Sequence, residues 1–210
     1  VKHADAALHT ASVGMSERLG LRGDDRFALV FPLTHVAGGV YLYAAMAYGV
    51  LFIVDEAFDP STTIELLQRE RVTQAGAGTY FHQVYLQAQR DRPDEQIFPE
   101  VRSFPGGGAP KPPQLHRDIR AAFGGAGIVS GYGLTEAPII TMNDASADSE
   151  VLALTEGPAV EGAKVRVVGD GGAEVVQGEE GELQVKGLLV TRGYLYGSLD
   201  EEAIDDGWFR

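Results

Sequence analysis

The sequence predicts an α/β fold: a mostly parallel, helix-covered sheet followed by a small antiparallel β subdomain. Before about residue 144, about five apolar segments alternate with four segments of helical periodicity. These apolar segments lack polar–apolar alternation, which indicates strands buried on both faces, as in a parallel sheet between layers of helices. After that point helical periodicity disappears, and glycine turns separate alternating strands, which is typical of antiparallel hairpins.

A helix and a strand are expected first. Residues 5–19 place Leu8, Met15 and Leu19 near one helical face, and Gly20 follows them. Residues 27–31 are all apolar and are followed by Pro32, which predicts a strand that ends there.

Residues 36–54 form an uncharged run that is near the length of a membrane span. Its glycines and tyrosines lower its hydrophobicity, and Gly49 divides it into a helix-like part and a β-rich part. We therefore expect a buried helix over residues 36–48 and a buried strand over residues 50–54 rather than a membrane span.

The next helix begins at Asp59 and Pro60, because an aspartate at the N-cap and a proline in the first turn favour a helix start. It runs to about Arg71. The same periodicities continue in order through the following segments: strand 74–77, helix 80–90, strand 101–104, helix 112–122 and strand 128–130.

Alternating residues in the last quarter of the chain predict a hairpin sheet or small barrel. Residues 164–168 and 182–186 alternate, and glycines form turns between them. Residues 200–204 are expected to form one helical turn. We therefore divide the chain into an α/β subdomain over residues 1–148 and a small β subdomain over residues 149–210.

Composition narrows the classes of function. The formal net charge of −13 argues against nucleic-acid binding, which needs a basic patch. The absence of cysteine excludes disulfides, thiolate metal sites and cysteine nucleophiles, and it fits a cytoplasmic protein. The first residues also lack the charged-then-apolar order of a signal peptide.

One turn carries several groups suited to a nucleotide. It follows the last predicted parallel strand, a position where open α/β sheets bind ligands. Tyr132 offers a flat face for a base, Thr135 a hydroxyl for a phosphate oxygen, and Glu136 a hard oxygen ligand for Mg²⁺. The alternative is an ordinary tight turn followed by a helix, with Thr135 and Glu136 exposed.

Two further segments are expected at the same edge of the sheet. Residues 105–110 contain three successive glycines, which let a backbone approach a ligand, although a flexible loop is the alternative. His35 follows a predicted strand and could orient a carboxylate or close a pocket, although a lone histidine can also be structural. The fingerprints GxGxxG, GxxxxGK[ST], GxSxG and HExxH are absent from the sequence.

Four stretches, taken together and in order, resemble the acyl-adenylate-forming enzymes, which include acyl-CoA synthetases, luciferases and peptide-synthetase adenylation domains. The matching stretches are residues 31–38, 107–110, 131–137 and 181–194, and residues 207–210 resemble the start of a further motif. The resemblance extends over nearly the whole chain. It implies the large N-terminal domain of this superfamily.

The resemblance implies a role for each matching residue. Tyr132 stacks on adenine, Thr135 binds the α-phosphate, Glu136 holds Mg²⁺, and His35 lies between the acyl chain and its carboxylate. His35, Thr135 and Glu136 are the implied catalytic residues. The implied ATP- or AMP-binding residues are Gly108, Ala109, Pro110, Gly131, Tyr132, Gly133 and Thr135. The implied substrate-binding residues are His35, Val36, Gly107 and Gly133.

The implied reaction uses ATP and Mg²⁺ to convert a small carboxylic acid to an acyl-adenylate, and CoA then accepts the acyl group. The apolar residues near Val36 and Tyr41 suggest a medium-sized apolar acid, whether alicyclic, aromatic or medium-chain. The alternatives are an adenylation domain that loads a carrier protein, a non-catalytic nucleotide-binding remnant, and a plain α/β interaction module.

Parts of the superfamily pattern have no counterpart in these residues. They are a phosphate-gripping loop before Val1, an aspartate for the ribose hydroxyls after Arg210, and a small C-terminal domain with a catalytic lysine. The resemblance therefore implies a fragment of the large N-terminal domain, and we expect residues 1–210 alone not to catalyse adenylation.

Overall fold

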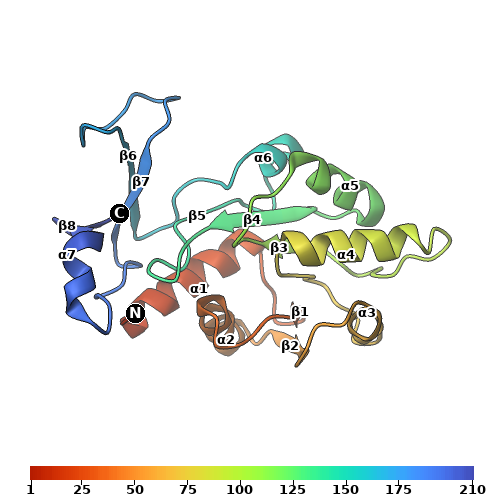
Figure 1. Ribbon diagram of the computed structural model, residues 1–210. Coiled ribbons are helices and arrows are strands. Elements are labelled where there is room, and N and C mark those ends of the chain that lie inside the picture. The colour runs from red at the N-terminus through yellow and green to blue at the C-terminus, as the bar shows by residue number, and fades with distance from the viewer.

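The structure is a computed structural model that describes residues 1–210, apart from the side chain of Asp5. Its helices are α1 (Asp5–Leu19), α2 (Val36–Tyr48), α3 (Pro60–Arg69), α4 (Thr79–Arg90), α5 (Pro113–Phe123), α6 (Ser149–Leu154) and α7 (Asp200–Ala203), with a 3₁₀ turn at Gly197–Leu199 (Figure 1). Its strands are β1 (Arg26–Leu29), β2 (Leu51–Val54), β3 (Phe104–Gly106), β4 (Ile128–Tyr132), β5 (Thr141–Met142), β6 (Ala163–Val168), β7 (Glu182–Gly187), β8 (Ile204–Asp205) and β9 (Trp208–Phe209).

The predicted parallel sheet is confirmed. Strand β1 pairs in parallel with β2, β3 pairs in parallel with β4, and β5 is antiparallel to β4. Gln74 makes isolated parallel bridges to Phe27 and to Ser103, so it joins the two groups in the order β2, β1, Gln74, β3, β4, β5. The strand predicted over residues 74–77 is therefore reduced to a single bridging residue.

Helices cover both faces of this sheet, as the lack of alternation in its strands predicts. On one face, Ala28 and Ile128 pack with the inner residues of α3, α4 and α5. On the other face, Phe27 and Val129 pack with α1 and α2. Because alternate residues of β1 and β4 enter different clusters, each strand contributes to two cores.

Several strands differ from their predicted bounds or burial. Strand β1 ends at Leu29 rather than at residue 31. Strand β3 begins at Phe104 rather than at residue 101, because Val101 packs in the core from the loop before the strand. Strand β4 continues to Tyr132, since its last residues pair with β5. The prediction that both faces of every strand are buried is wrong for β2, where Leu51 and Val54 are 46% and 55% exposed because β2 lies at the end of the strand order.

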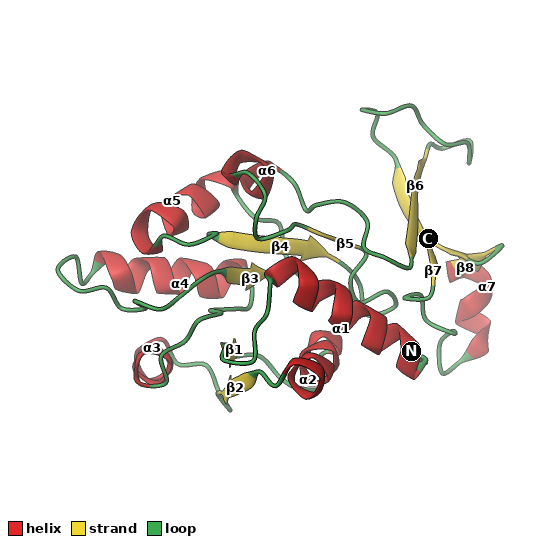
Figure 2. Cartoon of the chain, turned by 180° about the vertical axis from the view of Figure 1, so that it is seen from behind, coloured by secondary structure: helices red, strands yellow, loops and turns green.

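The predicted antiparallel sheet is also present, with its strands in the order β6, β7, β9, β8. Figure 2 shows β6 and β7 projecting from one end of the molecule, beside α7. The helical turn predicted over residues 200–204 forms as α7. Helix α6, which the sequence analysis did not predict, packs against α5 and β4. The division at residues 148 and 149 stays a prediction.

The start of the chain is tied to the segment before α7. The Lys2 amide donates to the Gly193 carbonyl at 2.8 Å, and the Arg192 amide donates to the Lys2 carbonyl at 2.8 Å.

The uncharged run over residues 36–54 forms α2 and β2, as predicted. Among the residues that the structure describes, no helix combines the length and apolar character needed to cross a membrane.

Candidate active site

A cavity of about 500 Å³ lies beyond the carboxyl ends of β1, β3 and β4. Its walls come from residues 77–81, 106–109 and 131–135, together with side chains of α1, α2 and β5. The structure brings these predicted site residues together in one lining: His35, Val36, Gly107, Gly108, Ala109, Gly131, Tyr132, Gly133 and Thr135. Pro110 and Glu136 are predicted site residues outside the lining.

His35 is the N-cap of α2, and this position fixes the orientation of its ring. Its Nδ1 accepts a hydrogen bond from the Ala37 amide at 3.2 Å. The ring also meets Phe31 edge-on, with 5.9 Å between the ring centroids. In neutral imidazole an accepting Nδ1 leaves the proton on Nε2. His35 can therefore cap the helix and still offer an Nε2–H donor at the wall of the cavity.

Tyr132 ends strand β4, where its backbone pairs with Thr141. Tyr132 is 40% exposed and lines the cavity, so a planar base in the cavity can reach its ring. The chain then turns, with the Leu134 amide bonded to the Ala137 carbonyl at 2.8 Å. The helix that the alternative interpretation predicts after this turn does not form, because residues 138–142 return to pair with β4 instead.

Thr135 and Glu136 lie in this turn, which contacts distant parts of the chain. His3 Nε2 lies 2.5 Å from the Thr135 carbonyl oxygen, and the Thr191 amide donates to the Glu136 carbonyl at 2.7 Å. The Tyr194 hydroxyl donates to Oε1 of Glu136 at 2.8 Å. This hydrogen bond to a carboxylate raises the pKa of Tyr194.

The donor set at Glu136 fits Mg²⁺ bound together with phosphates. Among the described residues no group of three metal-ligating side chains occurs, and Mg²⁺ is usually held by one or two carboxylates together with substrate phosphates. Tyr194 occupies Oε1, and no side chain of the described residues donates to Oε2. Glu136 could therefore hold the ion through Oε2 while Tyr194 fixes the carboxylate.

Backbone packing explains two of the glycines in the lining. A Cβ at Gly133 would lie 2.2 Å from the Pro138 carbonyl oxygen, and a Cβ at Gly107 would lie 2.9 Å from that of Gly131. Both distances are too short for any side chain. Gly107 therefore lets the loop after β3 approach strand β4, and Gly133 lets the turn after β4 close on itself, besides leaving space in the cavity.

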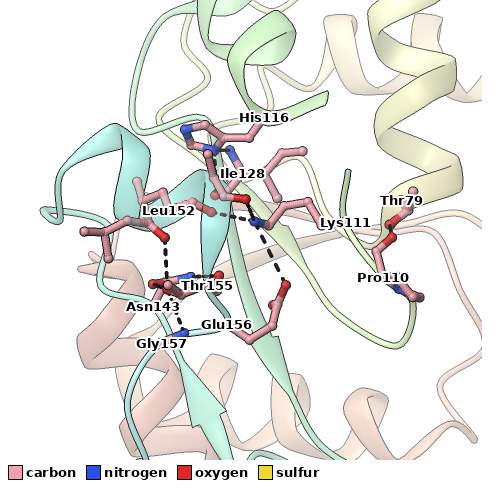
Figure 3. A network of polar contacts seen from close by, with 12 residues as sticks. Thr79, Pro110, Lys111, His116, Ile128, Asn143, Leu152, Thr155, Glu156 and Gly157 are labelled. Carbon is pink, nitrogen blue, oxygen red and sulfur yellow. Dashed lines mark hydrogen bonds and ion pairs between the residues drawn. The ribbon is translucent and has the colours of Figure 1, made fainter. Parts of the chain in front are cut away.

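The loop over residues 107–110 is fixed from two directions (Figure 3). Thr79 Oγ1 donates to the Pro110 carbonyl at 3.0 Å. Lys111, whose side chain is 4% exposed, donates from Nζ to the carbonyls of Leu152 and Ala153 at 2.5 and 2.9 Å. These carbonyls lie in the last turn of α6, where intrahelical donors are lacking. Lys111 thus ties the glycine loop to α6.

Burial lowers the pKa of Lys111, and the nearby Glu156 carboxylate opposes this shift. His82 supports β3, the strand that leads into this loop: its Nε2–H donates to the Pro105 carbonyl at 3.1 Å. Burial lowers the pKa of His82 to about 4, so the ring is neutral at pH 7.

Sequence reasoning missed Lys111, His82 and Tyr194 as supports of the site. Lys111 follows the glycine loop directly, and this position is the one sequence signal that could have identified it as a support of the site. Tyr194 lies within the matching stretch 181–194, but nothing in the sequence places it beside Glu136. His82 carries no spacing that could have linked it to Pro105.

An exposed tyrosine, a threonine hydroxyl and a carboxylate held by Tyr194 lie beyond the ends of parallel strands, which is the position of the ligand site in open α/β proteins. The sequence matches the AMP-binding enzyme family over residues 1–195, and the chain belongs to that family. The chain is 32% identical to feruloyl-CoA synthase from Amycolatopsis sp over 194 residues, which cover 90% of this chain and 38% of that protein. The chain thus spans less than half the length of this relative.

Solved structures show the same fold. A fatty acyl CoA synthetase of Mycobacterium tuberculosis superposes with a TM-score of 0.84 at 30% identity, covering 99% of this chain and 41% of that chain. The O-succinylbenzoate coenzyme A synthetase of Bacillus subtilis, solved with ATP and magnesium ion, has a TM-score of 0.83 at 24% identity. This match covers 99% of the present chain and 42% of the Bacillus subtilis chain. At this identity the second likeness shows the fold alone.

Proposed function

We propose that the protein containing this chain is an AMP-forming acid–thiol ligase, which activates a carboxylic acid with ATP and transfers it to CoA. The observation that carries the proposal is that Tyr132 and Thr135 line a largely apolar cavity, while Glu136 follows them in the same turn with its carboxylate held by Tyr194. Membership of the AMP-binding family and similarity to feruloyl-CoA synthase support it. CoA is favoured over a carrier protein because both relatives with at least 30% identity described above are named for CoA chemistry.

In the first step a carboxylate oxygen of the acid attacks the α-phosphorus of ATP. An O–P bond forms, the bond between the α-phosphorus and the bridging oxygen breaks, and pyrophosphate leaves. In the second step the thiolate of CoA attacks the acyl carbonyl carbon and AMP leaves. Both steps depend on positioning the reactants and on stabilising charge at the phosphate and the carbonyl.

The residues of the cavity have distinct roles in this proposal. Tyr132 stacks on adenine, and Thr135 donates a hydrogen bond to the α-phosphate. His35 donates from Nε2 to the carboxylate and so orients it, because its Nδ1 is engaged with the Ala37 amide. Glu136 holds Mg²⁺, which when bound neutralises charge on the phosphates.

The acid we propose is aromatic, a class within the medium-sized apolar acids that the sequence suggests. The rings of Phe31, Tyr41, Tyr80 and Phe81 contribute to the cavity lining. Aromatic pairs gain stability from edge-to-face and offset contacts beyond simple burial, so these walls favour a flat ring over a flexible alkyl chain. The similarity to feruloyl-CoA synthase supports the same class of acid.

A cytoplasmic location of the protein stays a prediction.

The test is acid-dependent formation of AMP and pyrophosphate by the complete enzyme with ATP, Mg²⁺ and a panel of aromatic and aliphatic acids. Mass spectrometry then detects the acyl-CoA once CoA is added. Glu136→Gln keeps an oxygen that can accept from Tyr194 but removes the charge, and we expect it to lower kcat/KM by about 100-fold.

The matched control is Glu161→Gln, which removes an exposed carboxylate outside the cavity lining and should leave the rate unchanged. Formation of ADP instead of AMP, or a rate that is independent of added acid, would overturn the proposed reaction. An unchanged rate in Glu136→Gln would overturn the role of Glu136.

A further inference from the structure

We propose that Tyr194 is a positioning residue for Glu136: its hydroxyl holds one oxygen of the carboxylate and leaves the other for the Mg²⁺ that accompanies ATP. This inference rests on the proposed function. It goes further by making a residue near the end of the chain responsible for how tightly the complete enzyme binds ATP together with Mg²⁺.

The carboxylate of Glu136 has one hydrogen-bond donor and no cation. Glu136 is half-buried, and the Tyr194 hydroxyl donates to its Oε1 at 2.8 Å. Among the residues that the structure describes, no other group donates to this carboxylate, and no lysine, arginine or histidine forms an ion pair with it. An ionised carboxylate can accept at both of its oxygens. Tyr194 therefore sets the orientation of the carboxylate and leaves its charge uncompensated.

Tyr194 is itself held in place by contacts that do not involve Glu136. Its amide donates to Oδ1 of Asp200 at 2.7 Å. Its ring packs against an apolar cluster that includes Val185 of β7 and Phe209 of β9. The position of the hydroxyl is therefore fixed before a ligand binds, which is what a preorganised support requires.

The same segment also holds the main chain of Glu136, because the Thr191 amide donates to the Glu136 carbonyl at 2.7 Å. A glutamate side chain that is free to rotate loses conformational entropy when it binds an ion, whereas a side chain that is already held loses less. Removing such a supporting partner of a metal-binding group typically lowers metal affinity by roughly 10- to 100-fold. Loss of the Tyr194 hydroxyl should therefore weaken binding of the ion rather than of the nucleotide.

The test measures the affinity of the complete enzyme for ATP by isothermal titration calorimetry without acid, once with Mg²⁺ and once with EDTA. The ratio of the two dissociation constants is the gain in affinity that Mg²⁺ supplies. Tyr194→Phe removes only the hydroxyl and keeps the ring in its apolar surroundings. We expect this gain to fall about tenfold in Tyr194→Phe, while the affinity in EDTA stays the same. In the acid-dependent assay, the Mg²⁺ concentration that gives half the maximal rate should rise by a similar factor.

Tyr196→Phe is the matched control, because Tyr196 is highly exposed and its hydroxyl forms no hydrogen bond with Glu136, so the gain should not change in it. Glu136→Gln, alone and combined with Tyr194→Phe, completes a double-mutant cycle. Since Tyr194 acts through Glu136, the second substitution should cause no further loss of the gain. If Tyr194→Phe does not fold, Tyr194→Met replaces it, because a flexible apolar side chain fills the space without a hydroxyl.

The two proposals fail in different ways. Failure of the proposed function gives no acid-dependent AMP with the wild-type enzyme. Failure of this inference alone leaves that activity intact, with the same gain from Mg²⁺ in wild type and in Tyr194→Phe. A purely structural role for Tyr194 weakens ATP binding equally with and without Mg²⁺, and losses that add up in the double variant show that Tyr194 acts independently of Glu136. Each of these last two results also overturns the inference.

Discussion

At the scale of single residues, Tyr132 has two roles, and both follow from its position at the end of β4. Its backbone completes the pairing with β5, while the residue stays 40% exposed and lines the cavity. A ring held by a strand loses little further freedom when a base stacks on it. We therefore expect Tyr132→Ala to weaken binding of AMP by about 1 kcal/mol or more.

Isothermal titration calorimetry of AMP with the complete enzyme measures this change. Tyr196→Ala is the control, because Tyr196 is highly exposed and lies outside the cavity lining. Equal affinity in wild-type enzyme and Tyr132→Ala would remove the stacking role.

At the scale of elements, the contact between α4 and β3 makes stability depend on pH. Folded His82 has a pKa near 4 because it is buried, whereas the unfolded side chain titrates near 6.5. Between these values the unfolded chain binds a proton that the folded chain does not. The free energy of unfolding therefore falls as the pH falls from 6.5 to 4, by about 3 kcal/mol from this residue.

Urea unfolding of the enzyme at pH 7 and at pH 4.5 checks this dependence. His82→Gln keeps an N–H near the position of Nε2 without a group that titrates in this range, so it should lose less stability than the wild type on acidification. His9→Gln changes an exposed histidine and should behave like the wild type. The same loss in all three proteins would contradict the prediction.

The elements themselves could be predicted well where periodicity and caps agree. Helices α1 and α2 have the predicted bounds, and Asp59 caps α3 by accepting from the Ser61 and Thr62 amides. The length of the strand near Gln74 could not be predicted, because it depends on neighbouring strands that are distant in sequence. The burial of β2 was predicted wrongly, because its apolar residues do not reveal that it lies at the end of the strand order.

The candidate site was predicted as a set of segments but not as a set of contacts. The rule that ligands bind beyond the carboxyl ends of strands places His35, Gly107 and Tyr132 in one region, and the cavity includes all three. The pairing of Glu136 with Tyr194 joins residues 58 positions apart in the chain, so no local pattern records it. Their roles in binding stay predictions.

At the scale of the whole molecule, charge limits what residues 1–210 can do. The net charge is −13, and the cavity lining that the structure describes contains no lysine or arginine. A triphosphate needs cationic groups around it during transfer. We therefore expect residues 1–210 alone not to catalyse carboxylate-dependent exchange of pyrophosphate into ATP.

Labelled pyrophosphate exchange with the purified 210-residue chain measures this, and the complete enzyme serves as the positive control. Appreciable exchange by residues 1–210 would show that groups already in this chain are sufficient.

The contacts of the turn around Glu136 also determine when this region can assemble during synthesis. Its support from Thr191 and Tyr194 comes from residues almost sixty positions later in the chain. At a translation rate of about 5–20 residues per second, they leave the ribosome roughly 3–12 s after Glu136. The parallel part of the sheet can form in that interval, since strands β1 to β4 all precede Glu136. The Glu136 carboxylate is thus expected to be among the last groups fixed, and nascent chains stalled before residue 191 should carry a folded sheet with this turn still mobile.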